Sequence, residues 1–167
     1  MTTATTSTGT PHHIQAILNG ARHTFGTLLG DAATIQPPTL IPAHAMAGDE
    51  INVLVGFTDD LQGQILIGFS REVALALSTH MMGGMEVTQF DELTQSILAE
   101  VGNMTAGSCA TELHNLGLKA NITCPTVIMG QSLQLGWPQM YILRAAIQLP
   151  FGTANLAIGL KVTNKSA

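Results

Sequence analysis

Hydrophobic residues recur at helical spacing from residue 14 to residue 29, directly after Pro11. Proline is favoured in the first turn of a helix and glycine just past its end, so this run predicts a helix between Pro11 and Gly30. The segment 37–42 that follows holds three prolines, each of which lacks a backbone donor and has a fixed φ angle. That segment is therefore predicted to be extended or irregular.

Two runs rich in β-branched and aromatic residues come next, at 51–57 and 63–69, and a short polar segment joins them. This arrangement is typical of a β-hairpin. Three further strands are predicted in the C-terminal part of the chain, at 121–129, 139–149 and 153–162. Their connections contain glycine and proline, at 130–138 and 150–152.

Two more helices are predicted between these groups of strands. Ser70 can accept a hydrogen bond from the first turn of a helix over 71–82, which a glycine pair ends. Thr88 and Asp91 resemble a capping box at the start of a longer helix that ends before Gly117. The elements together predict an α+β fold, with an antiparallel or mixed sheet and long helices packed on one face.

The longer helix places polar side chains on one flank. At roughly 100° per residue, Ser96, Glu100, Asn103 and Gly107 form a strip. The side next to this strip is apolar and is expected to face the core; it contains Leu93, Ile97, Val101, Met104 and Ser108. The side expected to face away carries small residues where a solvated helix would carry Lys and Glu, namely Ala99, Gly102, Ala106 and Ala110.

Small residues allow another backbone to approach closely, and a glycine inside a helix costs about 1 kcal/mol relative to alanine. We therefore interpret this part of the helix as a docking surface around Glu100 and Asn103. The candidate docking residues are Ser96, Ala99, Ala106 and Gly107. The alternative is a helix simply buried against a sheet or a second helix, with Glu100 at the edge of the domain. Spacing alone does not separate the two interpretations.

A weak internal similarity links the first and the long predicted helix. Asn19 and Gly26 resemble Asn103 and Gly107, whereas Ala16 stands where Glu100 would be expected. If the two halves of the chain are related, only the second half keeps the paired polar side chains.

The chain has 167 residues, which is enough for a single domain with its own core. We predict that domain over 11–162, between a disordered tail at 1–10 and a flexible tail at 163–167. Only 10% of the residues are charged and 46% are hydrophobic. Much of the surface must therefore be neutral or covered by a partner, which favours self-association.

Charge and hydropathy exclude several classes of partner. The net charge is −5, and six Lys and Arg residues are too few to neutralise a run of phosphates, so nucleic acid is not an expected partner. No stretch approaches 18 consecutive apolar residues, and the first ten residues lack the features of a signal peptide. We therefore expect a cytoplasmic protein without membrane insertion.

Motifs for the common kinds of catalytic centre are missing. Cys109 and Cys124 have no CxxC spacing, which favours two reduced structural thiols over a disulfide or a metal site. The six histidines form no HExxH pattern, and no metal site is predicted. No phosphate-binding glycine loop is present, and Ser108 lies mid-helix instead of on the strand-to-helix turn of a nucleophilic serine.

The pattern Ser96-x-x-x-Glu100-x-x-Asn103, followed by Gly107 and Leu113, resembles the signature of the CheC/CheX/FliY phosphatases of bacterial chemotaxis. The proline-containing segment 124–130 and the closing hairpin 149–160 are similar to later elements of that family. The resemblance extends from about residue 11 to residue 162. One ExxN copy, together with the hairpin over 53–69, makes the chain most similar to CheX.

This resemblance implies a CheC/CheX-like fold and a phosphatase that hydrolyses the aspartyl phosphate of a CheY-like response regulator. It also implies a homodimer joined at a sheet edge. Glu100 would contact the active-site lysine of the regulator, and Asn103 would enter its active site. An acyl phosphate is already activated, so what it lacks is a water held in line with phosphorus, and a carboxamide can bind that water as donor and acceptor. The chain itself would need no cofactor, since the required Mg²⁺ would belong to the receiver domain.

Two other hypotheses use the same helix face. One is a non-catalytic scaffold or switch component that binds a receiver, and the other is a structural dimer in which the face is buried against a second protomer. Trp137 also departs from expectation, because its side chain could cover a sheet edge, pack in the core or meet a partner.

Overall fold

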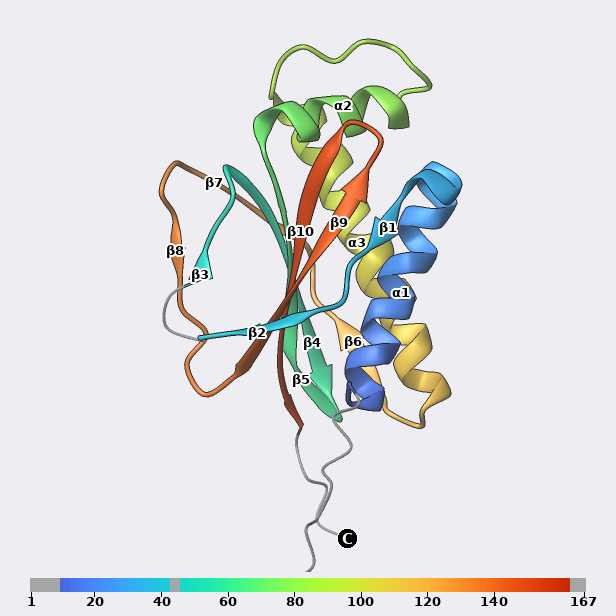
Figure 1. Ribbon diagram of the computed structural model, residues 1–167, viewed down its shortest axis with the longest axis vertical. Helices are drawn as coiled ribbons and strands as arrows, with labels where there is room; N and C mark the ends of the chain where they lie inside the picture. The colour runs from blue at the N-terminus through green and yellow to red at the C-terminus, as the bar shows by residue number, and fades with distance from the viewer. Residues whose placement is uncertain (1–9, 43–45, 163–167) are drawn as a thin grey trace, which may run out of the picture.

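The computed structural model describes residues 10–42 and 46–162. Figure 1 shows a sheet with α1 and α3 side by side on one of its faces and α2 at one end. The predicted tails at 1–10 and 163–167 lie outside the described residues, except for Thr10. The predicted α+β fold is confirmed.

Three α-helices and ten strands make up the described chain, with one short 3₁₀ turn after the first helix. The helices are α1 (His12–Leu29), α2 (Arg71–Met81) and α3 (Glu92–Asn115), and the 3₁₀ turn is η1 (Gly30–Ala32). The strands are β1 (Thr34–Ile35), β2 (Thr39–Ile41), β3 (Met46–Ala47), β4 (Ile51–Asp59), β5 (Leu61–Phe69), β6 (Ala120–Ile122), β7 (Thr126–Met129), β8 (Gln134–Leu135), β9 (Tyr141–Leu149) and β10 (Gly152–Val162).

The main sheet has two long hairpins at its centre, β4–β5 and β9–β10. Its order is β1-β9-β10-β5-β4-β6, with β2 also paired to β9 and β7 also paired to β4. All these pairings are antiparallel. Both hairpins confirm the predicted strands, although the β4–β5 turn is tighter than expected, because β4 continues to Asp59 and β5 begins at Leu61.

Short strands separated by proline form both outer edges of the sheet. Pro37 and Pro38 lie between β1 and β2, and Pro125 lies between β6 and β7. The predicted single strand over 121–129 is therefore wrong, since it is two strands with a break. Proline cannot donate to a strand ladder, which is the physical reason for a break at each edge.

The main core lies between the sheet and the pair α1 and α3, which cross closely at Gly20. A side chain at Gly20 would lie 2.5 Å from the Cys109 backbone, so only glycine fits this crossing. Around it, Ile17, Leu18 and Phe25 of α1 are at most 1% exposed. Each such large apolar side chain contributes about 1.5–3 kcal/mol when it is fully buried.

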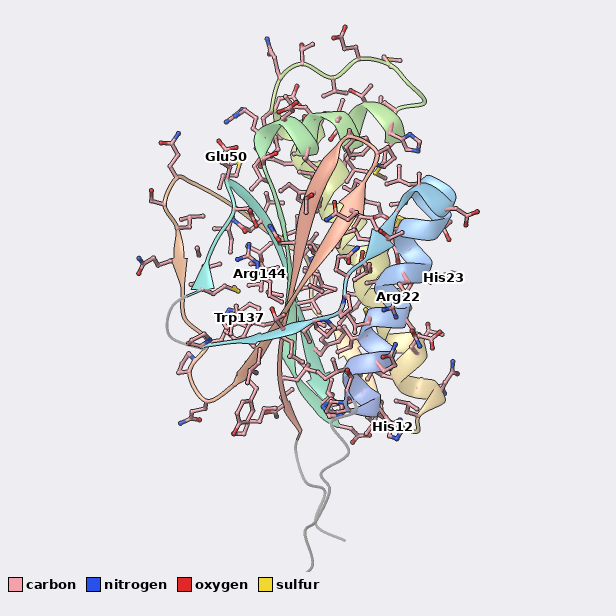
Figure 2. The ribbon with its side chains drawn as sticks, in the orientation of Figure 1. His12, Arg22, His23, Glu50, Trp137 and Arg144 are labelled. Carbon is pink, nitrogen blue, oxygen red and sulfur yellow. The ribbon has the colours of Figure 1, made fainter. Side chains whose placement is uncertain are left out.

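A second, smaller core covers the opposite face of the sheet. Trp137 is 6% exposed and packs there with Met46, Leu66, Ile142 and Ala157. Figure 2 shows Trp137 on the side of β2, β3 and β8, away from α1. Of the three positions considered for Trp137, the structure therefore selects a core position.

The two halves of the chain repeat one order of elements. A helix, two short edge strands and a long hairpin occur first as α1, β1–β2 and β4–β5, and again as α3, β6–β7 and β9–β10. Asn19 and Asn103 are 84 residues apart, and the same offset joins Thr24 to Ser108, whose hydroxyl oxygens lie 3.0 Å apart between the helices. The pairing of Asn19 with Asn103 thus corresponds to equivalent helices packed against each other, whereas Gly26 and Gly107 do not share this offset.

Candidate functional site

α3 carries the candidate pair and is fixed at both ends. The Asp91 side chain caps its first turn by accepting a hydrogen bond from the Thr94 N–H at 3.1 Å. That bond favours the charged carboxylate and is the main reason why the pKa of Asp91 is lowered. Asp91 is thus the N-cap itself, so the predicted capping box led by Thr88 is wrong. The helix ends before Gly117, whose φ of 77° is a left-handed value that favours glycine.

The buried side of α3 is not the side that its pattern predicted. Leu93, expected in the core, is 50% exposed. Gly102, expected to face away, lies directly on β4, where an added side chain would collide with Val53. Small residues on this side serve close packing between helix and sheet. The buried residues of α3 are Thr94, Leu98, Val101, Gly102, Thr105, Ala106, Cys109 and Leu113.

This packing removes one residue from the predicted docking set. Ala106 is fully buried, so a partner cannot reach it and its assignment as a docking residue is wrong. Ser96 is exposed, whereas Ala99 and Gly107 are half-buried. An added side chain at Gly107 would meet no atom within 4 Å, so this position opens to the surroundings.

Glu100 and Asn103 both point to the exposed side of α3, one turn apart. Three residues of helical rise separate their backbones by about 4.5 Å along the axis. Within the described part of the chain, neither side chain takes part in a hydrogen bond or an ion pair. Both are therefore available to a partner, and their chemistry is that of an unpaired carboxyl group beside a carboxamide.

A shallow groove of about 490 Å³ runs beside this pair. Four residues of α3 form one wall, namely Ser96, Ala99, Glu100 and Asn103, and the break in the sheet edge forms the other, with Ile122, Thr123, Cys124 and Pro125. Of these lining residues, only Glu100 has a carboxyl or amino group in its side chain. The second wall is not predicted from the helix pattern, although Pro125 within a predicted strand is a signal for it.

The asparagine of the first helix is placed differently from Asn103. The Asn19 side chain accepts hydrogen bonds from Gln15 at 3.1 Å and from Arg22 at 3.0 Å, within α1 itself. Its neighbour Ala16 is buried. The first half of the chain therefore has no exposed acid and amide pair at the equivalent place.

Other features of the described residues offer less chemistry. A larger hollow of about 880 Å³ lies between the start of α1, strand β2, the first residues of β9 and the last residues of β10. Most of its lining is apolar, including Ile14, Leu40 and Leu143. No group of three or more His, Cys, Asp or Glu side chains suited to a metal occurs among the residues described. Within the same residues, no helix is long and apolar enough to cross a membrane.

Fold and site together define an exposed acid and amide pair on a helix, beside an open groove. Comparison with known proteins identifies the family. The family model described as chemotaxis phosphatase CheX matches residues 51–144. A protein from Thermotoga maritima described as CheY-P phosphatase CheX is 37% identical over 123 residues, which are 73% of this chain and 78% of the relative. The chain belongs to the CheX family of chemotaxis phosphatases.

Solved structures show the same fold. A chemotaxis protein CheX from Desulfovibrio desulfuricans has a TM-score of 0.79 at 20% identity, and the match covers 90% of this chain and 100% of that one. A CheX–CheY–BeF₃–Mg²⁺ complex from Borrelia burgdorferi gives a TM-score of 0.74 at 25% identity, with 89% and 97% covered.

Proposed function

We propose that this chain hydrolyses the aspartyl phosphate of a CheY-like receiver domain, with Asn103 positioning the attacking water and Glu100 docking the receiver. One observation carries the proposal: in a member of the CheX family, these two side chains stand exposed and unpaired on one wall of an open groove. The related CheX from Borrelia burgdorferi forms a complex with CheY, which supports a receiver as the partner.

The chemistry requires little of the chain beyond positioning. A carboxamide both donates and accepts hydrogen bonds, so Asn103 can hold a water in line with phosphorus. Glu100 would pair with a cationic side chain of the receiver, and a hydrogen bond to a charged group contributes about 1.5–3 kcal/mol. Neither residue acts as a covalent nucleophile.

The required Mg²⁺ would be bound by the receiver and not by this chain. The CheX–CheY complex from Borrelia burgdorferi contains BeF₃ and Mg²⁺. We also propose that the protein works in the cytoplasm, where receiver domains are phosphorylated.

The decisive experiment follows the decay of a phosphorylated CheY-type receiver in Mg²⁺ buffer, with and without this chain. We expect acceleration by the wild-type protein, and a loss of about 100-fold in Asn103→Ala, the scale for losing one positioning contact. Asn19→Ala, which changes the equivalent residue of α1 outside the groove, is the matched control and should keep full activity. Equal rates for Asn103→Ala and wild type would exclude the water-positioning role.

Glu100→Ala should act mainly on binding. The receiver concentration at half-maximal rate should rise by about tenfold or more, because a charge-assisted contact is lost. Glu112→Ala removes a carboxyl group from the same helix outside the groove and is the control. If Glu100→Ala left binding unchanged, docking by this residue would be ruled out. Binding without any acceleration by the wild-type chain would favour the scaffold hypothesis.

The remaining candidate docking residues are tested by substitutions that enlarge or remove their side chains. Ala99→Leu and Gly107→Leu should weaken receiver binding, because each places a larger side chain on the exposed part of α3 next to the pair. Ser96→Ala should change binding by less than either. Circular dichroism would verify that each variant keeps its fold.

We further propose a homodimer that forms at the β2 edge. Leu40 and Tyr141 are 65% and 80% exposed there, and they are large hydrophobic side chains. Light scattering of wild type and Leu40→Lys would test this proposal, with a dimer expected only for the wild type.

A further inference from the structure

The second wall of the groove is a short break in the edge of the sheet. β6 ends and β7 begins on either side of residues 123–125, and both strands pair with β4. These three residues, here called the 123–125 wall, line the same groove as Glu100 and Asn103. A partner that reaches Asn103 in this groove therefore also meets the 123–125 wall.

Thr123 anchors this wall to β4 through two hydrogen bonds. Its backbone N–H donates to the Gly56 carbonyl at 3.0 Å, and its hydroxyl accepts from the Gly56 N–H at 2.8 Å. The hydroxyl thus takes the place of a strand carbonyl. The backbone after Thr123 is released from the ladder and forms a wall beside α3, instead of continuing along the sheet.

β4 supports both walls of the groove. α3 rests on Val53 and Val55 through Gly102, where no side chain would fit, and the 123–125 wall rests on Gly56 through Thr123. Because one strand holds both, the spacing between them is fixed before any partner arrives. A preformed groove of this kind needs little reordering when it binds.

We propose that the 123–125 wall is a second docking element, which contacts the receiver beside its phosphoryl site and sets the orientation in which α3 enters. The inference rests on the proposed function, since continuity with Glu100 and Asn103 identifies the occupant. The wall presents a hydroxyl, a thiol and a proline ring, and no charge. It fits a neutral or apolar strip of the receiver surface next to the cation that Glu100 would bind.

Thiol alkylation offers a direct test, because one of the two cysteines of the chain is buried and the other is exposed. Cys109 is buried, and burial raises the pKa of its thiol to about 12, whereas Cys124 is exposed on the wall. A maleimide at neutral pH should thus report on Cys124. A receiver loaded with beryllofluoride and Mg²⁺, at ten times its Kd, should slow this alkylation by about tenfold.

The matched control moves the thiol to the other face of the molecule. In the double variant Cys124→Ala/Gln134→Cys, the reactive thiol lies on β8, which is exposed and pairs with β3 away from α3. Its alkylation should not change when the receiver is added. Asn103→Ala should keep the protection of Cys124, because the wall acts in docking and not in hydrolysis.

Thr123 provides the positioning test. Thr123→Val keeps the shape and removes the hydroxyl that Gly56 uses, so the half-saturating receiver concentration should rise about fivefold while the maximal rate stays within about twofold. Thr123→Ser keeps a hydroxyl and should restore wild-type binding. A general loss of structure would instead lower the maximal rate and the melting temperature.

The outcomes separate this inference from the proposed function. Accelerated hydrolysis with unprotected Cys124 would overturn the docking role of the wall and leave the phosphatase standing. Protected Cys124 without acceleration would support the wall in a receiver-binding protein and contradict the phosphatase. If the receiver gave neither effect, both proposals would be wrong.

Discussion

Gly20 lies where α1 crosses α3, and a single added methyl group there should be costly. Gly20→Ala would push a carbon to 2.5 Å from the Cys109 backbone, which cannot yield as a flexible side chain would. We expect a loss of about 1–3 kcal/mol in the free energy of unfolding, the range for overpacking in a core. Urea denaturation would measure it.

Gly26→Ala is the control in the same helix. An added side chain at Gly26 meets nothing within 4 Å, so only helix propensity changes, and the variant should gain up to about 1 kcal/mol. If both variants lost similar amounts, close helix crossing would not explain the first result.

The exposure of individual α3 residues was predictable only in part. Glu100 and Asn103 were predicted as exposed neighbours because their helical spacing fixes their relation to each other, and the structure confirms that placement. Ala106 and Gly102 were assigned to the wrong side. Their burial depends on how closely α3 approaches β4, and no local pattern encodes that distance.

The N-caps of α2 and α3 stabilise the first turn of each helix. The Ser70 hydroxyl accepts a hydrogen bond from the Val73 N–H at 3.2 Å, as the sequence predicted. Ser70→Ala removes this acceptor and should cost about 1 kcal/mol. Thermal unfolding would measure the change, and Ser70→Asp, which restores an acceptor, should recover most of it.

Asp91 adds a pH dependence to the stability of α3. Its pKa is lower in the folded protein than in the unfolded chain, chiefly because its carboxylate accepts from the Thr94 N–H. The stabilising effect is thus present above its ordinary pKa of 3.8 and is lost as the pH falls through the lowered value.

Asp91→Asn keeps a capping oxygen that does not titrate, so it is the informative variant. The melting temperature of the wild type should exceed that of the variant at neutral pH. This difference should shrink as the pH is lowered past 3.8. A difference that stayed constant with pH would contradict the role of the charged form.

Elements with strong local signals were predictable, and those set by tertiary pairing were not. Both hairpins and all three helices follow from periodicity, capping residues and glycines. The division of the predicted strand 121–129 combines a local cause, Pro125, with a long-range contact in which the Thr123 hydroxyl accepts from the Gly56 N–H. Pro125 indicates a break from the sequence, but only the Thr123 contact with β4 places that break beside α3 as a groove wall.

Two cores on opposite faces of one sheet should still unfold together, because β5 and β10 contribute side chains to both. Trp137 is the only tryptophan in the chain, so its fluorescence reports the smaller core alone. Its emission should shift to the red in the same urea transition in which circular dichroism detects the loss of helix.

Trp137→Ala should lower the free energy of unfolding of the whole molecule by about 3–5 kcal/mol, the range for deleting a large buried aromatic side chain. Trp137→Phe refills part of the space and should lose less. If the helices melted at an unchanged urea concentration in Trp137→Ala, the two cores would be independent.

The proline breaks at both sides of the sheet also bear on how this hydrophobic chain stays dispersed. An incoming strand needs a row of consecutive backbone donors and acceptors, and each border supplies at most four residues in one run before the ladder is interrupted. The interrupted borders therefore disfavour continued edge-to-edge growth into fibres, while leaving room for a single closed contact such as the proposed dimer at the β2 edge. The break that forms a wall of the groove thus also protects a chain that is 46% hydrophobic against aggregation.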